Sequence, residues 1–161
     1  MKFQIFKDKH YSDQFLYKSI NFLNLSSILT FKVNFDKSCI YNLNSPDQLD
    51  INKLFGFSNG FNHHKYSARF GWNSENDKIN IFSYVYDNGK RKSNPISTIE
   101  CGKYYKMAIV DDNTNWIFSI DNYFTMVPKS EKFKIGYKLW PYFGGNITSP
   151  HDMSIELINF S

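Results

Sequence analysis

The sequence predicts an all-β protein built as an antiparallel β-sandwich of the jelly-roll type. Aromatic residues make up 19% of the chain, with 16 Phe and 11 Tyr, whereas alanine occurs only at positions 68 and 108. Aromatic side chains favour strands and alanine favours helices. Short segments of alternating polar and apolar residues recur at intervals of roughly 8 to 12 residues, with turn residues between them, as in sandwiches. The 161 residues fit one domain spanning residues 1–161.

The first part of the chain contains two segments of clear alternation. Residues 2–6 are predicted to form a strand because their apolar residues share one face. Residues 11–29 follow neither a strand nor a helix period, so a strand–loop–strand unit and a short helical turn near residues 13–19 are both open. From residue 30 to residue 36, an apolar residue at every second position predicts a half-buried strand.

The next segments lead to the centre of the chain. Residues 39–43 are expected to continue the sheet until the turn Ser45-Pro46-Asp47, and residues 53–57 form an apolar run that ends at Ser58-Asn59-Gly60. Residues 66–72 are predicted to form a strand, and we expect Phe70 and Trp72 to pack inward, on the face opposite Arg69.

The most regular strand is predicted at residues 78–86. Aliphatic side chains occupy one face and the aromatic residues Phe82, Tyr84 and Tyr86 the other, so we expect both faces to be covered or used. Asn88-Gly89 follows directly and is typical of a type I′ hairpin turn, because both residues tolerate positive φ angles. The alternation in the C-terminal half predicts strands at 95–100, 103–110, 115–121, 123–127, 132–139 and 153–157.

The predicted strand 132–139 separates an apolar face from a lysine face. Tyr137 is expected on the apolar face with Phe133 and Leu139. Trp140 would continue the lysine face and precedes Pro141, so we predict that Trp140 is exposed. Trp116 is assigned to the core, because a sandwich of this size needs bulky core residues.

Two pairs of segments resemble the concanavalin A-like jelly-roll superfamily of lectins, laminin-G-type modules and glucanases. YYKMAIV at 104–110 and WIFSID at 116–121 are similar to its central hairpin, and FGG at 143–145 with MSIEL at 153–157 is similar to its closing strand. The resemblance implies a concanavalin-like sandwich. A closer likeness, to lectin-like domains of Bacteroidetes-type bacteria and their phages, lies in HH at 63–64, SARFGW at 67–72, PYFGG at 141–145 and PHD at 150–152.

A glycan-binding site needs an aromatic ring for the sugar's C–H groups and planar polar groups for its hydroxyls. The chain offers both kinds of side chain, although any single aromatic residue fits the core as well. The candidate ligand-binding residues are His63, His64, Arg69, Tyr84, Trp140, Tyr142, His151 and Asp152.

The same residues allow other interpretations. In a structural network, Asp152 or a backbone carbonyl would orient a histidine, and Arg69 would pair with a carboxylate. Zinc bound by His63, His64, His151 and Asp152 is a weaker alternative. Calcium at Asp111-Asp112-Asn113 would have three oxygen ligands from a turn, short of the usual six to eight. We therefore expect no cofactor, with calcium as the alternative.

The charge pattern argues against a nucleic-acid partner. The net charge is only +4, and the one basic run, Lys90-Arg91-Lys92, is expected in a solvated turn. No signal peptide or transmembrane segment is recognised, so we expect no membrane partner and a cytoplasmic or virion-associated protein. Cys39 and Cys101 are expected to be free thiols, and a disulfide between them is the alternative.

These observations favour a non-catalytic, lectin-like module that binds a glycan or a protein surface, so we predict that the chain is not an enzyme. A structural component of a phage virion, within a larger assembly, is the alternative. A glycoside hydrolase or polysaccharide lyase is less favoured, because no predicted strand carries the acidic-x-acidic pattern of the resembling glucanases.

Overall fold

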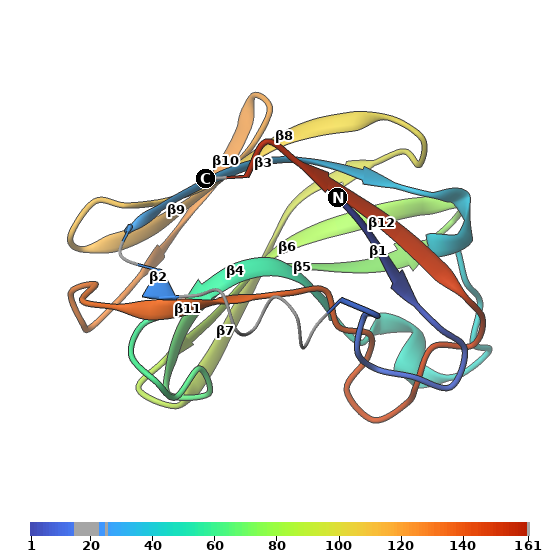
Figure 1. Ribbon diagram of the computed structural model, residues 1–161, viewed down its shortest axis with the longest axis horizontal. Coiled ribbons are helices and arrows are strands. Elements are labelled where there is room, and N and C mark those ends of the chain that lie inside the picture. The colour runs from blue at the N-terminus through green and yellow to red at the C-terminus, as the bar shows by residue number, and fades with distance from the viewer. Residues whose placement is uncertain (15–22, 25, 161) are drawn as a thin grey trace.

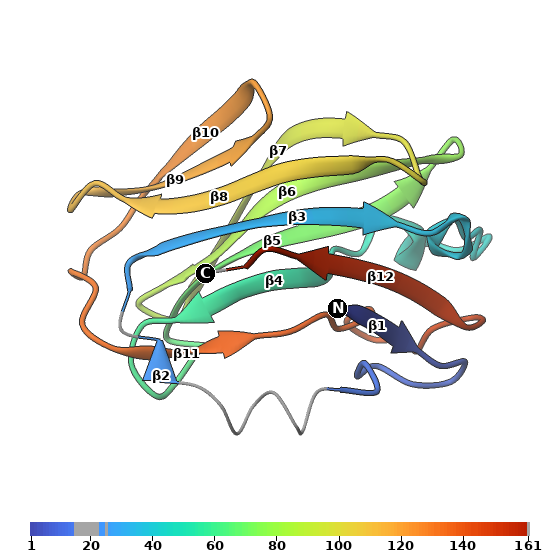
Figure 2. The same cartoon turned by 45° about the horizontal axis from the view of Figure 1, so that its top comes forward.

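The computed structural model describes residues 1–14, 23–24 and 26–160, which fold into two antiparallel sheets packed face to face (Figure 1). The predicted β-sandwich is confirmed. The first sheet has the strand order β1-β12-β3-β8-β9-β10. Figure 2 shows β3 running between β8 and β12. Its strands are β1 (Lys2–Ile5), β3 (Ile28–Phe35), β8 (Tyr104–Asp111), β9 (Asn115–Ile120), β10 (Tyr123–Pro128) and β12 (Met153–Ile158).

The second sheet has the order β2-β11-β4-β5-β6-β7 and carries the longest strands of the molecule. Two short 3-10 helices, η1 (Lys37–Cys39) and η2 (Pro46–Leu49), lie between β3 and β4. The strands of this sheet are β2 (Leu23–Asn24), β4 (Asn52–Ser58), β5 (Tyr66–Glu75), β6 (Lys78–Asp87), β7 (Lys90–Ile99) and β11 (Gly136–Leu139).

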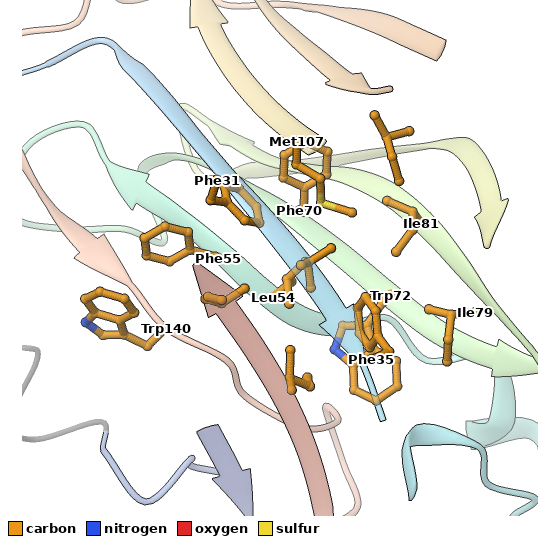
Figure 3. Packing of buried hydrophobic residues seen from close by; sticks show 14 of the residues in the cluster. Phe31, Phe35, Leu54, Phe55, Phe70, Trp72, Ile79, Ile81, Met107 and Trp140 are labelled. Atoms are coloured by element: carbon orange, nitrogen blue, oxygen red, sulfur yellow. The ribbon is translucent and has the colours of Figure 1, made fainter. Parts of the chain in front are cut away.

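The core lies between the two sheets, and its largest buried side chains are mainly aromatic (Figure 3). Phe70 and Trp72 of β5 are fully buried, as predicted, because residues at every second position of a strand share a face. A β-bulge interrupts the pairing of β4 with β5 between Lys53 and Gly56. Leu54 and Phe55 consequently both reach the core, and the Phe55 ring packs edge-on against Phe31 with centroids 5.1 Å apart.

Several predicted boundaries differ from the structure. The expected strand at 39–43 is wrong: η1 ends at Cys39, and residues 40–43 form no strand. The Asp36 carboxylate caps η1 by accepting a hydrogen bond from the Ser38 N–H. β7 begins at Lys90 rather than at residue 95, so the basic run is part of a strand. Within the ambiguous stretch 11–29, β2 and the start of β3 are strands, and residues 15–22 and 25 lie outside the described residues.

The predicted exposure of Trp140 is wrong, and the cause is a change of phase before β11. Phe133 packs on the core residue Phe57, but residues 129–135 are not a strand, so the alternation of side chains is not continuous across them. From Gly136 onward, the face of the strand that continues from the lysines to Trp140 points toward the core. Trp140 is therefore 5% exposed and stacks on Phe55 with ring centroids 4.7 Å apart (Figure 3).

Two other expectations concern cysteines and membranes. Cys39 and Cys101 are both free, and the buried Cys39 Sγ donates to the Ser154 carbonyl. In the described part of the chain, no helix has the length and apolar character needed to cross a bilayer.

Gly56 provides the space in which Arg69 crosses β4. A Cβ atom at position 56 would lie 2.2 Å from the Ala68 carbonyl oxygen and 2.3 Å from Arg69 Cα. We expect Gly56→Ala to reduce the free energy of unfolding in urea by about 3 kcal/mol, as overpacking against backbone atoms does. Gly145→Ala is the control, because its Cβ would meet only Asp50 Oδ2 at an ordinary 3.4 Å. Equal stability of the two variants would contradict this account.

Candidate functional site

A pocket of about 400 Å³ lies on the outer face of the second sheet. Residues that alternate with the core residues of β4, β5 and β6 form its floor, because strand residues alternate between faces. The loop before β5 and the segment after β11 form its walls. The lining residues are Tyr11, Lys53, His63, His64, Ser67, Arg69, Tyr84, Tyr86, Tyr137, Lys138, Leu139, Trp140, Tyr142, Gly144 and Gly145.

Arg69 lies at the floor of this pocket and is 8% exposed. Its Nη2 donates to the Trp140 carbonyl at 2.7 Å, whereas its Nε has no hydrogen-bond partner among the described residues. Burial lowers the pKa of Arg69 to about 10, so the guanidinium stays charged at neutral pH. Ser67, two residues earlier on the same face of β5, also has a buried oxygen without a partner. The floor therefore contains a buried N–H donor and a buried hydroxyl that no described residue satisfies.

Lys53 supplies a second cation from β4. Its Nζ donates to the Gly144 carbonyl at 2.7 Å and lies 5.4 Å from the ring centroid of Tyr84 and 5.5 Å from that of Tyr142. Burial, with the nearby charges of Arg69 and Arg91, lowers the pKa of Lys53 to about 8. Lys53 is therefore mostly protonated at neutral pH and loses its charge as the pH rises above 8.

His63 and Tyr137 form a hydrogen-bonded pair of proton-transfer groups at this pocket. His63 Nδ1 lies 2.6 Å from the Tyr137 hydroxyl oxygen. Burial, together with the positive charges of His64 and Arg69, lowers the pKa of His63 to about 4. Burial raises the pKa of Tyr137 above its ordinary value. At neutral pH the pair is therefore an uncharged imidazole joined to an uncharged phenol.

A turn before β5 places the two histidines. Asn62 accepts hydrogen bonds from the N–H groups of His64 and Lys65, through its side chain and its carbonyl respectively. The turn brings the rings of His63 and His64 to 4.1 Å between centroids, which an extended strand would not allow. His64 also packs edge-on against Tyr86 at 5.5 Å.

The pocket is unbalanced in charge. Lys53, Arg69 and Lys138 line it, and no Asp or Glu does so among the described residues. No ion pair in the described part of the chain involves Lys53 or Arg69. A buried cation without a counter-ion is costly. The pocket is therefore suited to an anionic ligand.

The structure brings six of the eight candidate residues together and separates the other two. His63, His64, Arg69, Tyr84, Trp140 and Tyr142 all line the pocket, Trp140 with the carbonyl that holds Arg69. His151 does not line it, and its Nε2 bonds the Ser38 carbonyl. Asp152 accepts from the Lys7 N–H outside the pocket. The expected carboxylate partner of Arg69 is replaced by a backbone carbonyl.

The fold does not support the metal-binding alternatives within the described residues. Among the described residues, no three His, Cys, Asp or Glu side chains lie close enough together to hold a metal ion. In the turn considered for calcium, Asp111 pairs with Lys129 at 2.7 Å and Asp112 accepts hydrogen bonds from Thr114 and Asn115. The absence of a cofactor stays a prediction.

Lys53 and Tyr137 were not recognised as site residues from the sequence. Lys53 stands beside the β-bulge of β4, and its segment reads as an apolar strand. Tyr137 was assigned to the apolar face because the change of phase before β11 leaves no mark in the alternation. The sequence signal beside Tyr137 is Gly136, which marks a close approach of two strands. A Cβ at Gly136 would lie 1.7 Å from the Ser58 carbonyl oxygen.

Comparisons with known proteins show the fold. No protein-family model and no curated protein matches the chain. A family 18 polysaccharide lyase, aly-SJ02, is 9% identical with a TM-score of 0.53, over 89% of this chain and 74% of its own. An alginate lyase from Alteromonas sp. 272 is 9% identical with a TM-score of 0.52 and the same coverages. The family 7 alginate lyase A1-II′ is 10% identical with a TM-score of 0.52, over 83% of this chain and 60% of its own.

These structures confirm the β-sandwich jelly roll that the sequence resemblance implied. They also contradict the prediction of a non-catalytic module and the prediction that the chain is not an enzyme, because the solved structures named here are lyases. The virion alternative has no support from these structures. Identities of 9–10% show the fold alone. Any reaction assigned to this chain must therefore be argued from the residues of the pocket.

The pKa of His63 tests the electrostatics of the pocket. We expect an NMR titration of the imidazole to give a pKa of about 4, and His64→Gln to raise it by removing a neighbouring positive charge. Lys65→Ala, at an exposed position of the same loop, should leave the value unchanged. Titration of His63 near its ordinary value of 6.5 would contradict the described burial.

Proposed function

We propose that this chain is a polysaccharide lyase that cleaves a uronate-containing polysaccharide by β-elimination. The observation that carries the proposal is the hydrogen-bonded pair of His63 and Tyr137 in a pocket whose cations have no carboxylate partners. The alginate lyases of the same fold act on such a polysaccharide, as their names state, and support the proposal.

The cations are suited to the substrate's carboxylate. Elimination begins with loss of the C5 proton, which is acidic only if the adjacent carboxylate is neutralised by nearby positive charge. Arg69 supplies a guanidinium that no described carboxylate pairs with, and Lys53 adds a second charge. A guanidinium matches a carboxylate in geometry, and burial strengthens the interaction.

His63 and Tyr137 are suited to the two proton transfers. In the tautomer in which Nδ1–H donates to the phenol oxygen, His63 Nε2 is free to accept the C5 proton. The C5 electron pair forms the C4–C5 double bond as the C4–O4 bond breaks, and the Tyr137 hydroxyl donates its proton to the leaving O4. Transfer of the Nδ1 proton to the resulting phenolate leaves both groups uncharged.

Hydrolysis is not favoured by the same pocket. Glycoside hydrolases use two carboxyl groups on either side of the scissile bond, and none of the described lining residues is an Asp or Glu. Elimination requires no carboxylate. The tyrosines Tyr86 and Tyr142 offer rings for neighbouring sugars, so a glycan is the proposed partner.

Tyr137→Phe tests the reaction directly. We expect the wild-type chain to release unsaturated products from alginate or another polyuronate, detected by their ultraviolet absorbance. The phenylalanine variant should be at least about 100-fold slower, because it lacks the proton donor. Removing one hydroxyl at a half-buried position should leave the fold intact, which circular dichroism checks.

The matched control is Tyr123→Phe, because Tyr123 is a 63% exposed tyrosine on β10 of the other sheet. Its activity should equal that of the wild type. Equal activity of Tyr137→Phe and the wild type would refute the assigned role, and absence of unsaturated product from a panel of acidic polysaccharides would refute the lyase.

A further inference from the structure

The chain has only two arginines among its 19 lysines and arginines, and both lie at the same face of the second sheet. Arg69 lies at the floor of the pocket. Arg91, on β7, lies outside the lining residues, but its guanidinium carbon is 5.9 Å from the ring centroid of Tyr84, which does line the pocket. Apart from histidine, all other basic residues of the sequence are lysines, so arginine is used only at these two positions.

The alternation of β7 directs Arg91 toward the pocket. The next residue, Lys92, bonds Asp87 Oδ2 at 2.8 Å and the Pro128 carbonyl at 3.0 Å, and Pro128 belongs to β10 of the first sheet. Since consecutive side chains of a strand point to opposite faces, Arg91 points away from the first sheet. Arg91 also pairs in register with Tyr86, another lining residue.

Arg91 continues the unpaired positive charge of the pocket toward the edge of the sheet. β7 is the last strand of the sheet order, and no described carboxylate forms an ion pair with Arg91. Tyr84 is contacted by two cations, because Lys53 Nζ lies 5.4 Å and the Arg91 guanidinium carbon 5.9 Å from its ring centroid. The positive charges of Arg69, Lys53 and Arg91 thus extend from the floor of the pocket across Tyr84 to β7.

We propose that Arg91, with the ring of Tyr86, forms a second carboxylate-binding subsite for the uronate adjacent to the one that reacts. The proposal rests on the proposed lyase function and narrows its substrate to chains with consecutive acidic sugars. A planar guanidinium binds a carboxylate through two parallel hydrogen bonds, whereas a lysine acts as a point charge. Arg91 is a substrate-binding residue outside the reacting centre, because the proposal places the reacting sugar at Arg69 and the Tyr137–His63 pair.

The test compares two neighbouring charge deletions. We expect Arg91→Ala to raise KM for polymeric alginate about fivefold with kcat unchanged, since an exposed charged pair contributes modestly. Arg91→Lys should recover only part of the loss. Lys90→Ala removes the same charge from the adjacent exposed residue on the opposite face of β7, and it should leave KM unchanged.

Binding without cleavage separates this proposal from the lyase itself. Calorimetric titration of an alginate hexasaccharide into Tyr137→Phe, alone and combined with Arg91→Ala or Lys90→Ala, should show weaker binding only with the arginine deletion. Equal effects of the two deletions would overturn the subsite whether or not the wild type cleaves. Selective weakening with no cleavage by the wild type would support the subsite and refute the lyase.

Discussion

The buried guanidinium of Arg69 is the constraint on which the site depends. The fold holds this cation at the centre of a sheet with one backbone carbonyl and no carboxylate, and it leaves Nε unused. Gly56 makes the position available, because any side chain there would collide with Arg69 itself. Such an arrangement costs stability unless an anion or water satisfies the remaining donor. The burial of Arg69 is therefore better explained by ligand binding than by stability.

The other groups acquire their properties from their positions around this charge. Arg69 contributes to the lowered pKa values of both Lys53 and His63, in addition to burial. His63 is therefore uncharged where an isolated histidine would be partly protonated, and it is held against Tyr137 by the turn at Asn62. The segment after β11 supplies the Trp140 carbonyl to Arg69 and the Gly144 carbonyl to Lys53, so one segment positions both cations.

The sandwich was predictable because strand alternation is a local property of the sequence. In β5, the alternation correctly places Phe70 and Trp72 in the core and Arg69 on the opposite face. Tyr137 and Trp140 were assigned to the wrong faces, because the irregular residues 129–135 shift the phase without an obvious signal. The histidines and Arg69 are close together in the sequence, whereas Lys53 joins them through the pairing of β4 with β5 and Tyr137 through the pairing of β11 with β4. Local patterns do not encode either pairing. His151 and Asp152 were grouped with the site by composition alone, and the fold places them on other partners.

The proposed function rests on the chemistry of the pocket, since structures at 9–10% identity establish only the fold. The central claim is that unpaired buried cations select a carboxylate. The most direct measurement is calorimetric binding of an alginate tetrasaccharide and of its carboxyl-reduced, neutral counterpart to the Tyr137→Phe variant. The account predicts that the neutral sugar binds at least about tenfold more weakly, as expected for loss of a charge-assisted hydrogen bond. Equal affinity for the two sugars would contradict it.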